Sequence, residues 1–190
     1  MLEDEMIANS RDAYGWPAIA LHWIVAALIV ATFGLGLWMG EVPSRADRPY
    51  YFMIHGSLGI TLLAILVLRI AWALLNPAPA AVAGTSPLQH AAARFTHLAL
   101  YALTLATVVF GWLLAGVQDT PVVPLAFGLV PVPSPLPLSH AAEDFLEEAH
   151  EITAYLLMLA AGVHVLAALW HHYVLRDETL RRMLGRHSAA

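Results

Sequence analysis

The sequence contains no cysteine among its 190 residues. This absence excludes disulfide bonds, thiolate metal sites, cysteine-ligated iron–sulfur clusters and haem attached through a Cys-x-x-Cys-His motif. Charged residues are also scarce, at 12% of the chain, whereas 59% of the residues are hydrophobic. This composition lies outside the usual range of soluble domains and indicates an integral membrane protein in contact with the lipid bilayer. We expect no nucleic acid among its partners.

Four hydrophobic segments are free of acidic residues along their apolar runs. Each is long enough to cross roughly 30 Å of hydrocarbon, which takes about 20 helical residues. Because backbone polar groups must be satisfied internally in lipid, and the connections are short, the sequence predicts an all-α membrane protein, an antiparallel four-transmembrane-helix bundle. The expected helices are 17–39, 51–75, 90–115 and 140–175, in a domain spanning 16–176 between a loosely ordered polar tail, 1–15, and a C-terminal tail, 177–190.

Basic residues are distributed unevenly between the connections. Arginines follow the fourth segment and flank the second connection, whereas the connection before the fourth segment has neither Lys nor Arg. The positive-inside rule therefore places both termini of this multi-pass protein in the cytoplasm. Arg45 and Arg48, in the first connection, argue weakly against this orientation. The first segment is too long for a cleavable signal peptide and lacks a basic leader.

The third connection, 116–139, contains six of the twelve prolines. It cannot form a helix, so we expect an extended cap over the outer end of the bundle, with Asp119 and Phe127 as its distinctive side chains. Ser139 is the expected N-cap of the fourth helix, and the acidic residues after it suit the positive end of a helix dipole.

The fourth hydrophobic segment carries His150 and His164, 14 residues apart. This spacing is close to whole helical turns, so the two imidazoles share a face at depths that differ by roughly 21 Å. Ala154, Ala161 and Ala168 lie on the same face and leave room for a bulky group. An ionisable side chain inside a membrane segment is a functional-site hypothesis by default.

The topology places two further histidines at matching depths. His22 lies near the inner face and His55 near the outer face, which pairs His55 with His150 and His22 with His164. Two facing neutral imidazoles are the axial ligands typical of a b-type haem. Gly59 lies one turn after His55 on its face, where a flat ligand can approach.

Several alternatives stay open from the residues alone. Each histidine can instead lie at the headgroup boundary, and His97 or His171 can replace an inner ligand. Arg69 either extends to the headgroups or pairs with an acidic group of a cofactor. Zinc fits less well because it needs three or four ligands at one point, and a proton relay normally recruits acidic residues, which the four spans lack.

The histidine motifs resemble the bacterial cytochrome b-561 family, and the similarity extends over nearly the whole chain. They are His22-Trp23, His55 with Gly59, His97-Leu-x-x-Tyr101, His150-Glu151, His164 and His171-His172-Tyr173, with Ala126-Phe-Gly128 and Asp177-x-Thr179-Leu-x-Arg182-Met183. The chain departs from the family at Arg94, where some relatives are expected to have histidine, and in its longer proline-rich cap.

The resemblance implies a di-haem membrane cytochrome that exchanges electrons with the quinone pool and, in at least one branch, oxidises superoxide at the outer side. The four haem-iron ligands of the family correspond to His22, His55, His150 and His164, and the resemblance therefore implies two haem b groups. We also expect Arg69 or Arg94 to balance the inner haem propionates, and Arg45 or Arg48 the outer ones. The rival hypotheses are a membrane-anchor subunit that serves a dehydrogenase or hydrogenase partner, and a non-redox histidine-rich metal carrier.

Overall fold

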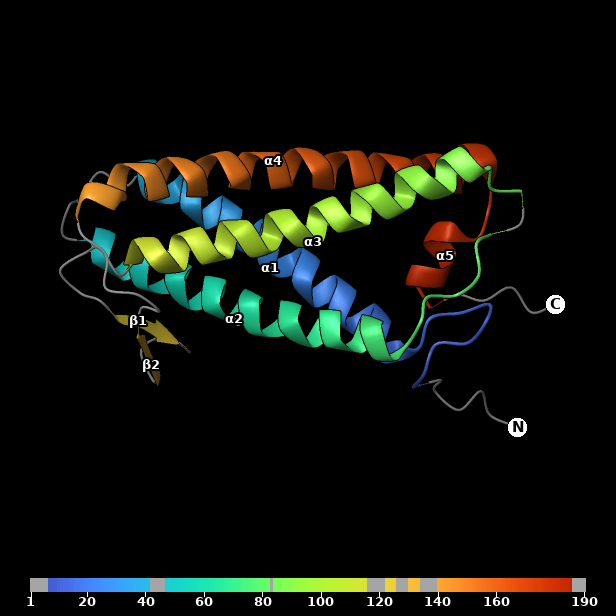
Figure 1. Cartoon of the computed structure of the whole chain (residues 1–190), viewed down its shortest axis with the longest axis horizontal. Coiled ribbons are helices and arrows are strands. Elements are labelled where there is room, and N and C mark those ends of the chain that lie inside the picture. Colours follow the sequence, from blue (N-terminus) through green and yellow to red (C-terminus); the bar gives the residue numbers. More distant parts are fainter. Residues whose placement is uncertain are drawn as a thin grey trace.

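The computed structural model describes residues 7–41, 47–82, 84–115, 122–125, 130–133 and 140–185. Four long antiparallel helices form a single bundle (Figure 1). Each has 26 to 29 residues, or roughly 40 Å, enough to span the hydrocarbon core. The predicted four-helix membrane fold is therefore confirmed. The helices are α1 Trp16–Glu41, α2 Arg48–Leu75, α3 Pro87–Ala115 and α4 Glu143–Trp170.

Local chemistry explains where the helices begin and end. At the start of α3 the Gln89 side chain accepts a hydrogen bond from the Ser86 N–H at 2.8 Å, and the Ser86 hydroxyl accepts one from the Gln89 N–H at 3.3 Å. This reciprocal capping places the start of the helix at Pro87. At the start of α4 a 3₁₀ turn, η1 His140–Ala142, precedes Glu143, and the N-cap residue is Ala142. The expected N-cap, Ser139, lies outside the described residues.

One end of the bundle, here called the hairpin end, contains the C-termini of α1 and α3 and the N-termini of α2 and α4 (Figure 1). Within the expected extended cap, β1 Val122–Leu125 and β2 Val130–Pro133 form an antiparallel pair with Val123 opposite Val132. Strand β1 lies beside α2. The other residues singled out in this cap, Asp119 and Ala126–Gly128, and Arg45 in the first connection, lie outside the described part of the chain.

The opposite end, here called the terminal end, is closed by segments from both ends of the chain. Helix α4 continues as a π-helical turn, η2 His171–Leu175, and after Arg176 the short helix α5 Thr179–Met183 folds back (Figure 1). The Trp23 indole N–H donates to the Met183 carbonyl at 2.8 Å. The Arg182 guanidinium donates to the Ala80 carbonyl at 2.7 Å, so α5 is tied to the loop between α2 and α3.

The N-terminal segment is more ordered than expected. The Asn9 side chain donates to the Asn76 and Pro77 carbonyls at 3.0 and 3.2 Å, and its carbonyl accepts from the Gly15 N–H at 2.9 Å. The Ala80 N–H donates to the Arg11 carbonyl at 2.8 Å. The expectation of a loose tail is therefore wrong for residues 9–15, because polar side chains fasten this segment to the end of α2.

Packing divides the bundle into two tight helix pairs, α1 with α2 and α3 with α4, which are joined mainly along α2 and α3. Among the described residues, the backbones of α1 and α4 make few or no close contacts. Val25, Leu62 and Val108 form a small buried cluster at the centre. Many large apolar side chains on the outside are exposed, as expected for helices whose solvent is lipid.

Candidate functional site

The histidine pair of the hairpin end joins α2 to α4. The imidazoles of His55 and His150 face each other with ring centroids 6.0 Å apart and planes at 80°. The His150 Nδ1 lies 2.8 Å from the Thr107 carbonyl of α3. Because a carbonyl only accepts, Nδ1 carries the proton and Nε2 keeps its lone pair. The hydrogen bond therefore leaves His150 in a tautomer that can ligate a metal through Nε2.

Two glycines lie directly against these imidazoles. A Cβ on Gly111 would lie 2.8 Å from His150 Cε1, and one on Gly36 would lie 3.3 Å from His55 Cε1. Sequence reasoning missed Gly111 because nothing in its local sequence relates it to a histidine on another helix. At Gly59, which was expected to give a flat ligand access, an added Cβ would have no heavy atom of the described chain within 4 Å beyond the adjoining backbone of its own helix and its chain neighbours.

The terminal end brings together three imidazoles rather than two. His22 of α1 and His164 of α4 have ring centroids 6.2 Å apart, with planes at 64°. His97 of α3 approaches His164 more closely, with centroids 5.3 Å apart and planes at 67°. The structure thus places His97 beside the predicted pair.

The guanidinium of Arg69 lies close to this three-histidine cluster. The Arg69 Nε donates to the Tyr101 hydroxyl at 3.0 Å, and the guanidinium lies 5.6 Å from the centre of the Tyr101 ring. Its charge acts on His22, His97 and His164. The Arg69 Nη1 is buried and has no hydrogen-bond partner in the described part of the chain. A buried donor of this kind fits an anionic oxygen of a ligand.

The other arginines that sequence reasoning proposed are placed differently. Arg94 on α3 and Arg48 at the start of α2 are both exposed. The Trp72 Nε1, by contrast, is buried on α2 without a partner among the described residues. Trp72 lies three residues after Arg69 and so shares its side of the helix. Its spacing from Arg69 was the only sequence signal that could have identified it.

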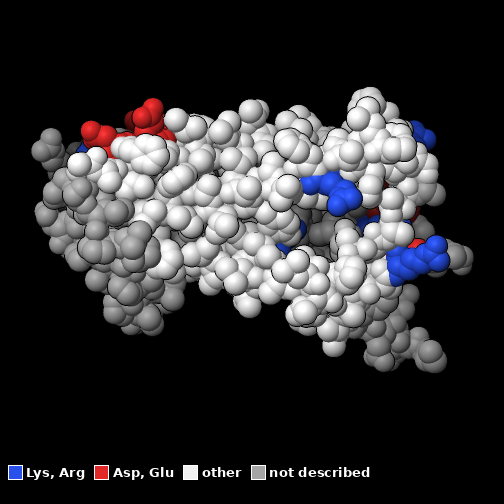
Figure 2. Space-filling model, in the orientation of Figure 1, with Lys and Arg blue, Asp and Glu red and all other residues white. Residues whose placement is uncertain are grey.

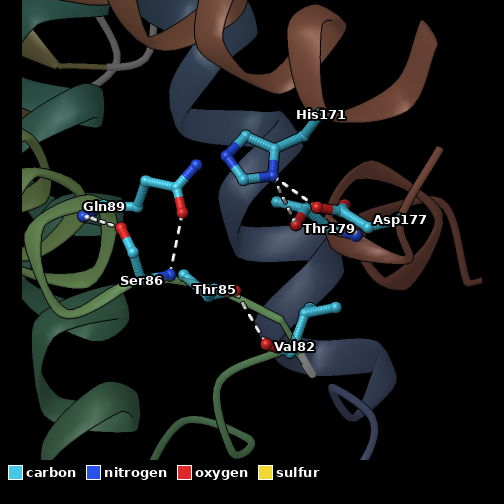
Figure 3. Close-up of polar contacts among 7 residues, drawn as sticks. All are labelled: Val82, Thr85, Ser86, Gln89, His171, Asp177 and Thr179. Carbon is cyan, nitrogen blue, oxygen red and sulfur yellow. Dashed lines mark hydrogen bonds and ion pairs between the residues drawn. The ribbon is translucent and has the colours of Figure 1, made fainter. Parts of the chain in front are cut away.

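His171 is bound to the C-terminal segment. Its Nδ1 lies 2.5 Å from Asp177 Oδ2 and 3.4 Å from the Thr179 hydroxyl (Figure 3). The Thr179 N–H donates to Asp177 Oδ1 at 2.9 Å. Burial acts to raise the pKa of the Asp177 carboxyl, but hydrogen bonds from His171 and Thr179 outweigh it and leave the pKa below its ordinary value. The carboxylate is therefore ionised at neutral pH.

The spacing of the two predicted pairs fits a metal held between two imidazoles. With metal–nitrogen bonds of about 2 Å and about 1 Å from nitrogen to ring centre, the two centroids lie roughly 6 Å apart. His55–His150 and His22–His164 have this spacing, whereas His97–His164 is shorter. Among the described residues, no group of three or more metal-binding side chains is placed so that it could hold one metal ion, the three imidazoles of the terminal end included.

Comparison with known proteins identifies the family. Residues 13–186 match the family model described as prokaryotic cytochrome b561. The chain belongs to the prokaryotic cytochrome b561 family. It is 36% identical to cytochrome b561 homolog 2 of Escherichia coli K12, an alignment that covers 95% of this chain and 96% of the relative. It is also 33% identical to the probable superoxide oxidase CybB of Yersinia pestis, over 91% of this chain and 96% of that protein.

The family establishes the general function. A member of the prokaryotic cytochrome b561 family is a bacterial membrane protein that binds haem b and transfers electrons. The helices that span the membrane are the same ones that carry the histidine pairs. The paired imidazoles and the family membership therefore both indicate that the protein binds haem.

Proposed function

We propose that the chain is a di-haem cytochrome with one haem b between His55 and His150 and a second between His22 and His164. The observation that carries the proposal is the pair of facing imidazoles at each of two levels, with centroids 6.0 and 6.2 Å apart. Each haem supplies one-electron exchange at its iron. The spacing of α1 and α4 supports the placement, because the described backbones of these helices make few or no close contacts while aromatic side chains reach across, His22 to His164 and Phe33 to Tyr155.

The ligand assignment at the terminal end rests on the distances between the imidazole rings. His97 is the nearer neighbour of His164, but their 5.3 Å centroid separation is short for two imidazoles on opposite sides of one metal. Among the ring contacts of the described residues, His164 is joined to His22 and to His97, and none joins His171 to these three imidazoles. We therefore assign His22 and His164 as ligands, with His97 beside them.

Residues around the ligands have distinct tasks in this proposal. Gly36 and Gly111 let the neighbouring helices approach the imidazoles, and Gly59 leaves a flat surface on the face of His55. The Arg69 Nη1, buried and unpaired among the described residues, donates to a haem propionate of the terminal-end site. Exposed Arg94 and Arg48 are less suited to that task.

The proposed orientation places the terminal end in the cytoplasm and the protein in the inner membrane. Arg11, Arg176, Arg181 and Arg182 all lie near the terminal end, whereas the start of α4 at the hairpin end is acidic. Positive charge near the ends of membrane helices favours the cytoplasmic side.

Quinone is the proposed redox partner, and superoxide is the second candidate. The name of the Yersinia pestis relative supports superoxide. Figure 2 shows a cluster of acidic side chains at the hairpin end, where α4 begins with Glu143 and Asp144. Because this cluster repels anions, the surface favours a neutral quinone over superoxide as partner.

The membrane-anchor hypothesis shares the same fold and haem sites, with a partner redox protein as donor or acceptor. Purification of the tagged protein from its own membranes distinguishes the two hypotheses. A second chain recovered in constant ratio favours an anchor subunit, whereas a single chain that is active alone favours an independent cytochrome.

The proposed function is tested by adding electrons to the purified cytochrome in lipid vesicles. A short-chain ubiquinol should reduce both haems, as seen in the b-type absorption bands, to the extent that dithionite does. Enzymatically generated superoxide should reduce them more slowly. Haem bands that respond to dithionite but not to ubiquinol would contradict quinone exchange, and faster reduction by superoxide would establish the second candidate.

A further inference from the structure

The indole of Trp72 provides a second buried donor on α2, beside Arg69. The side chain is half-buried, but its Nε1 is buried and has no hydrogen-bond partner among the described residues. An indole N–H can only donate. Because a buried donor without an acceptor destabilises a fold, this N–H indicates an acceptor that the described part of the chain does not supply.

Trp72 and Arg69 lie on one side of α2. They are three residues apart, so their Cβ atoms are about 5–6 Å from each other. The Arg69 Nε donates to the Tyr101 hydroxyl of α3, which fixes the guanidinium. The Nη1 remains, like the indole N–H, buried and unpaired within the described ranges. Two neighbouring donors, one of them charged, suit the two oxygens of a single carboxylate.

The position of these donors suits a propionate of the haem proposed between His22 and His164. The Arg69 charge acts on both of these imidazoles. Trp72 lies about one turn further along α2, towards the terminal end. A charged propionate is more stable near that edge of the bundle than at the centre of the membrane. Figure 2 shows the surface hollowed at the terminal end, where α2 and α3 diverge.

The N-terminal segment covers this end of α2. The Asn9 side chain donates to the Asn76 carbonyl, one turn after Trp72. Burial raises the pKa of the Tyr14 hydroxyl above its ordinary value, although the charges of Arg182 and Arg69 act to lower it. Tyr14 is therefore protonated at neutral pH and lies within reach of the Arg69 charge. A segment that limits water here strengthens hydrogen bonds from α2 to an anion.

We propose that Trp72 Nε1 and Arg69 Nη1 together bind one propionate of the haem between His22 and His164. The inference rests on the proposed haem at that pair and adds Trp72 as a haem-binding residue. Arg69 supplies the charge, whereas the neutral indole supplies direction. Two axial imidazoles leave a macrocycle free to turn about the line that joins them, so a propionate held by two donors fixes its orientation.

The test uses the haem-loaded protein with ¹³C in the propionate carboxyl groups, introduced by growing cells on labelled 5-aminolevulinate. Trp72→Phe keeps an aromatic ring but removes the N–H. We expect its labelled carboxylate band in the infrared isotope-difference spectrum to shift from the wild-type position, because one donor to the carboxylate is lost. Trp38→Phe is the matched control, since Trp38 is 54% exposed and lies at the hairpin end, and its band should not move.

Haem dissociation gives a second measurement. Transfer of haem from the detergent-solubilised protein to excess apomyoglobin should show two phases, and His22→Ala should lack the phase of the terminal-end haem. In Trp72→Phe that phase should be faster by roughly tenfold, the usual value of a hydrogen bond to a charged group. Trp38→Phe should keep both wild-type rates.

A closer replacement separates hydrogen bonding from packing. Benzothienylalanine has the shape of tryptophan, with sulfur in place of the N–H, and can be inserted at position 72 alone. It should reproduce both effects of Trp72→Phe. Wild-type behaviour of this protein, or faster dissociation without a band shift, would show that Trp72 acts by packing and would overturn the proposal.

The outcomes distinguish this inference from the proposed function. If the wild type holds one haem and His22→Ala keeps it, the terminal-end haem itself is wrong. If the wild type holds two haems and His22→Ala loses one, that haem is established. Unchanged carboxylate bands in both Trp72 replacements would then show that the propionate is bound elsewhere.

Discussion

The two histidine levels differ in the way that their imidazoles are held. At the hairpin end, His55 and His150 form an isolated pair with glycine backbone against each ring and a carbonyl on His150 Nδ1. At the terminal end, His22 and His164 share their surroundings with His97 and with the charge of Arg69. The difference indicates that packing fixes the first site, whereas charge and hydrogen bonding adjust the second.

The largest expected effect comes from replacing a haem ligand. Replacing His55 with Ala should remove the hairpin-end haem and halve the haem content, because the remaining imidazole, that of His150, cannot supply both axial ligands. His97→Ala is the matched variant and should retain both haems. Haem per chain, measured as the pyridine haemochrome, checks both. Loss of a haem in His97→Ala would show that the terminal-end ligand pair is misassigned.

The second prediction concerns the steric control of the hairpin end. Gly111→Ala places a methyl group 2.8 Å from His150 Cε1. The ring must shift, at a cost of about 1–3 kcal/mol for overpacking, and we expect most of the hairpin-end haem to be lost. Gly34→Ala meets nothing within 4 Å and is the control. Wild-type spectra for Gly111→Ala would mean that His150 is free to move.

A third prediction uses the flat surface at Gly59. Beyond the adjoining residues and backbone of α1 or α2 themselves, no described protein atom lies within 4 Å of a Cβ at either Gly59 or Gly34, so the protein alone accepts alanine at both. If a haem lies against Gly59, Gly59→Ala should shift the absorption bands or midpoint potential of that haem, whereas Gly34→Ala should not. Equal spectra for the two variants would remove Gly59 from the haem site.

The smallest expected effect concerns the electrostatic difference between the two ends of the bundle. The Arg69 charge favours the reduced haem, so Arg69→Ala should lower the terminal-end midpoint potential by about 50–100 mV, from a charge at about 8 Å in an effective dielectric of about 20. The exposed Arg94 is the control, and Arg94→Ala should shift the potential by less than about 20 mV because water and salt screen it. A redox titration checks both values, and an unchanged Arg69→Ala potential would contradict the propionate assignment.

The fold was predictable because hydrophobic length and the absence of internal charge determine a membrane helix with little help from tertiary contacts. The pairing of His55 with His150 followed from chain direction, whereas the choice of His22 and His164 over His97 and His171 rested partly on the family resemblance. Their proximity in the structure agrees with that reasoning.

Other features depended on contacts that sequence spacing does not reveal. Gly111 lies against an imidazole of a different helix. The Nη1 of Arg69, which has no hydrogen-bond partner among the described residues, reflects the position of Tyr101 on α3. The ordered segment at residues 9–15 and the return of α5 to Trp23 arise from side-chain hydrogen bonds to backbone carbonyls. Such bonds between residues far apart in the chain leave no local pattern.

The central claim is that two pairs of imidazoles bind two haems. The most direct measurement is the ratio of haem b to protein in the purified wild-type chain, obtained from the pyridine haemochrome spectrum and quantitative amino-acid analysis. Two facing pairs predict a ratio near two haems per chain. A ratio near one in fully loaded protein would contradict the claim, because one of the two levels would then hold no haem.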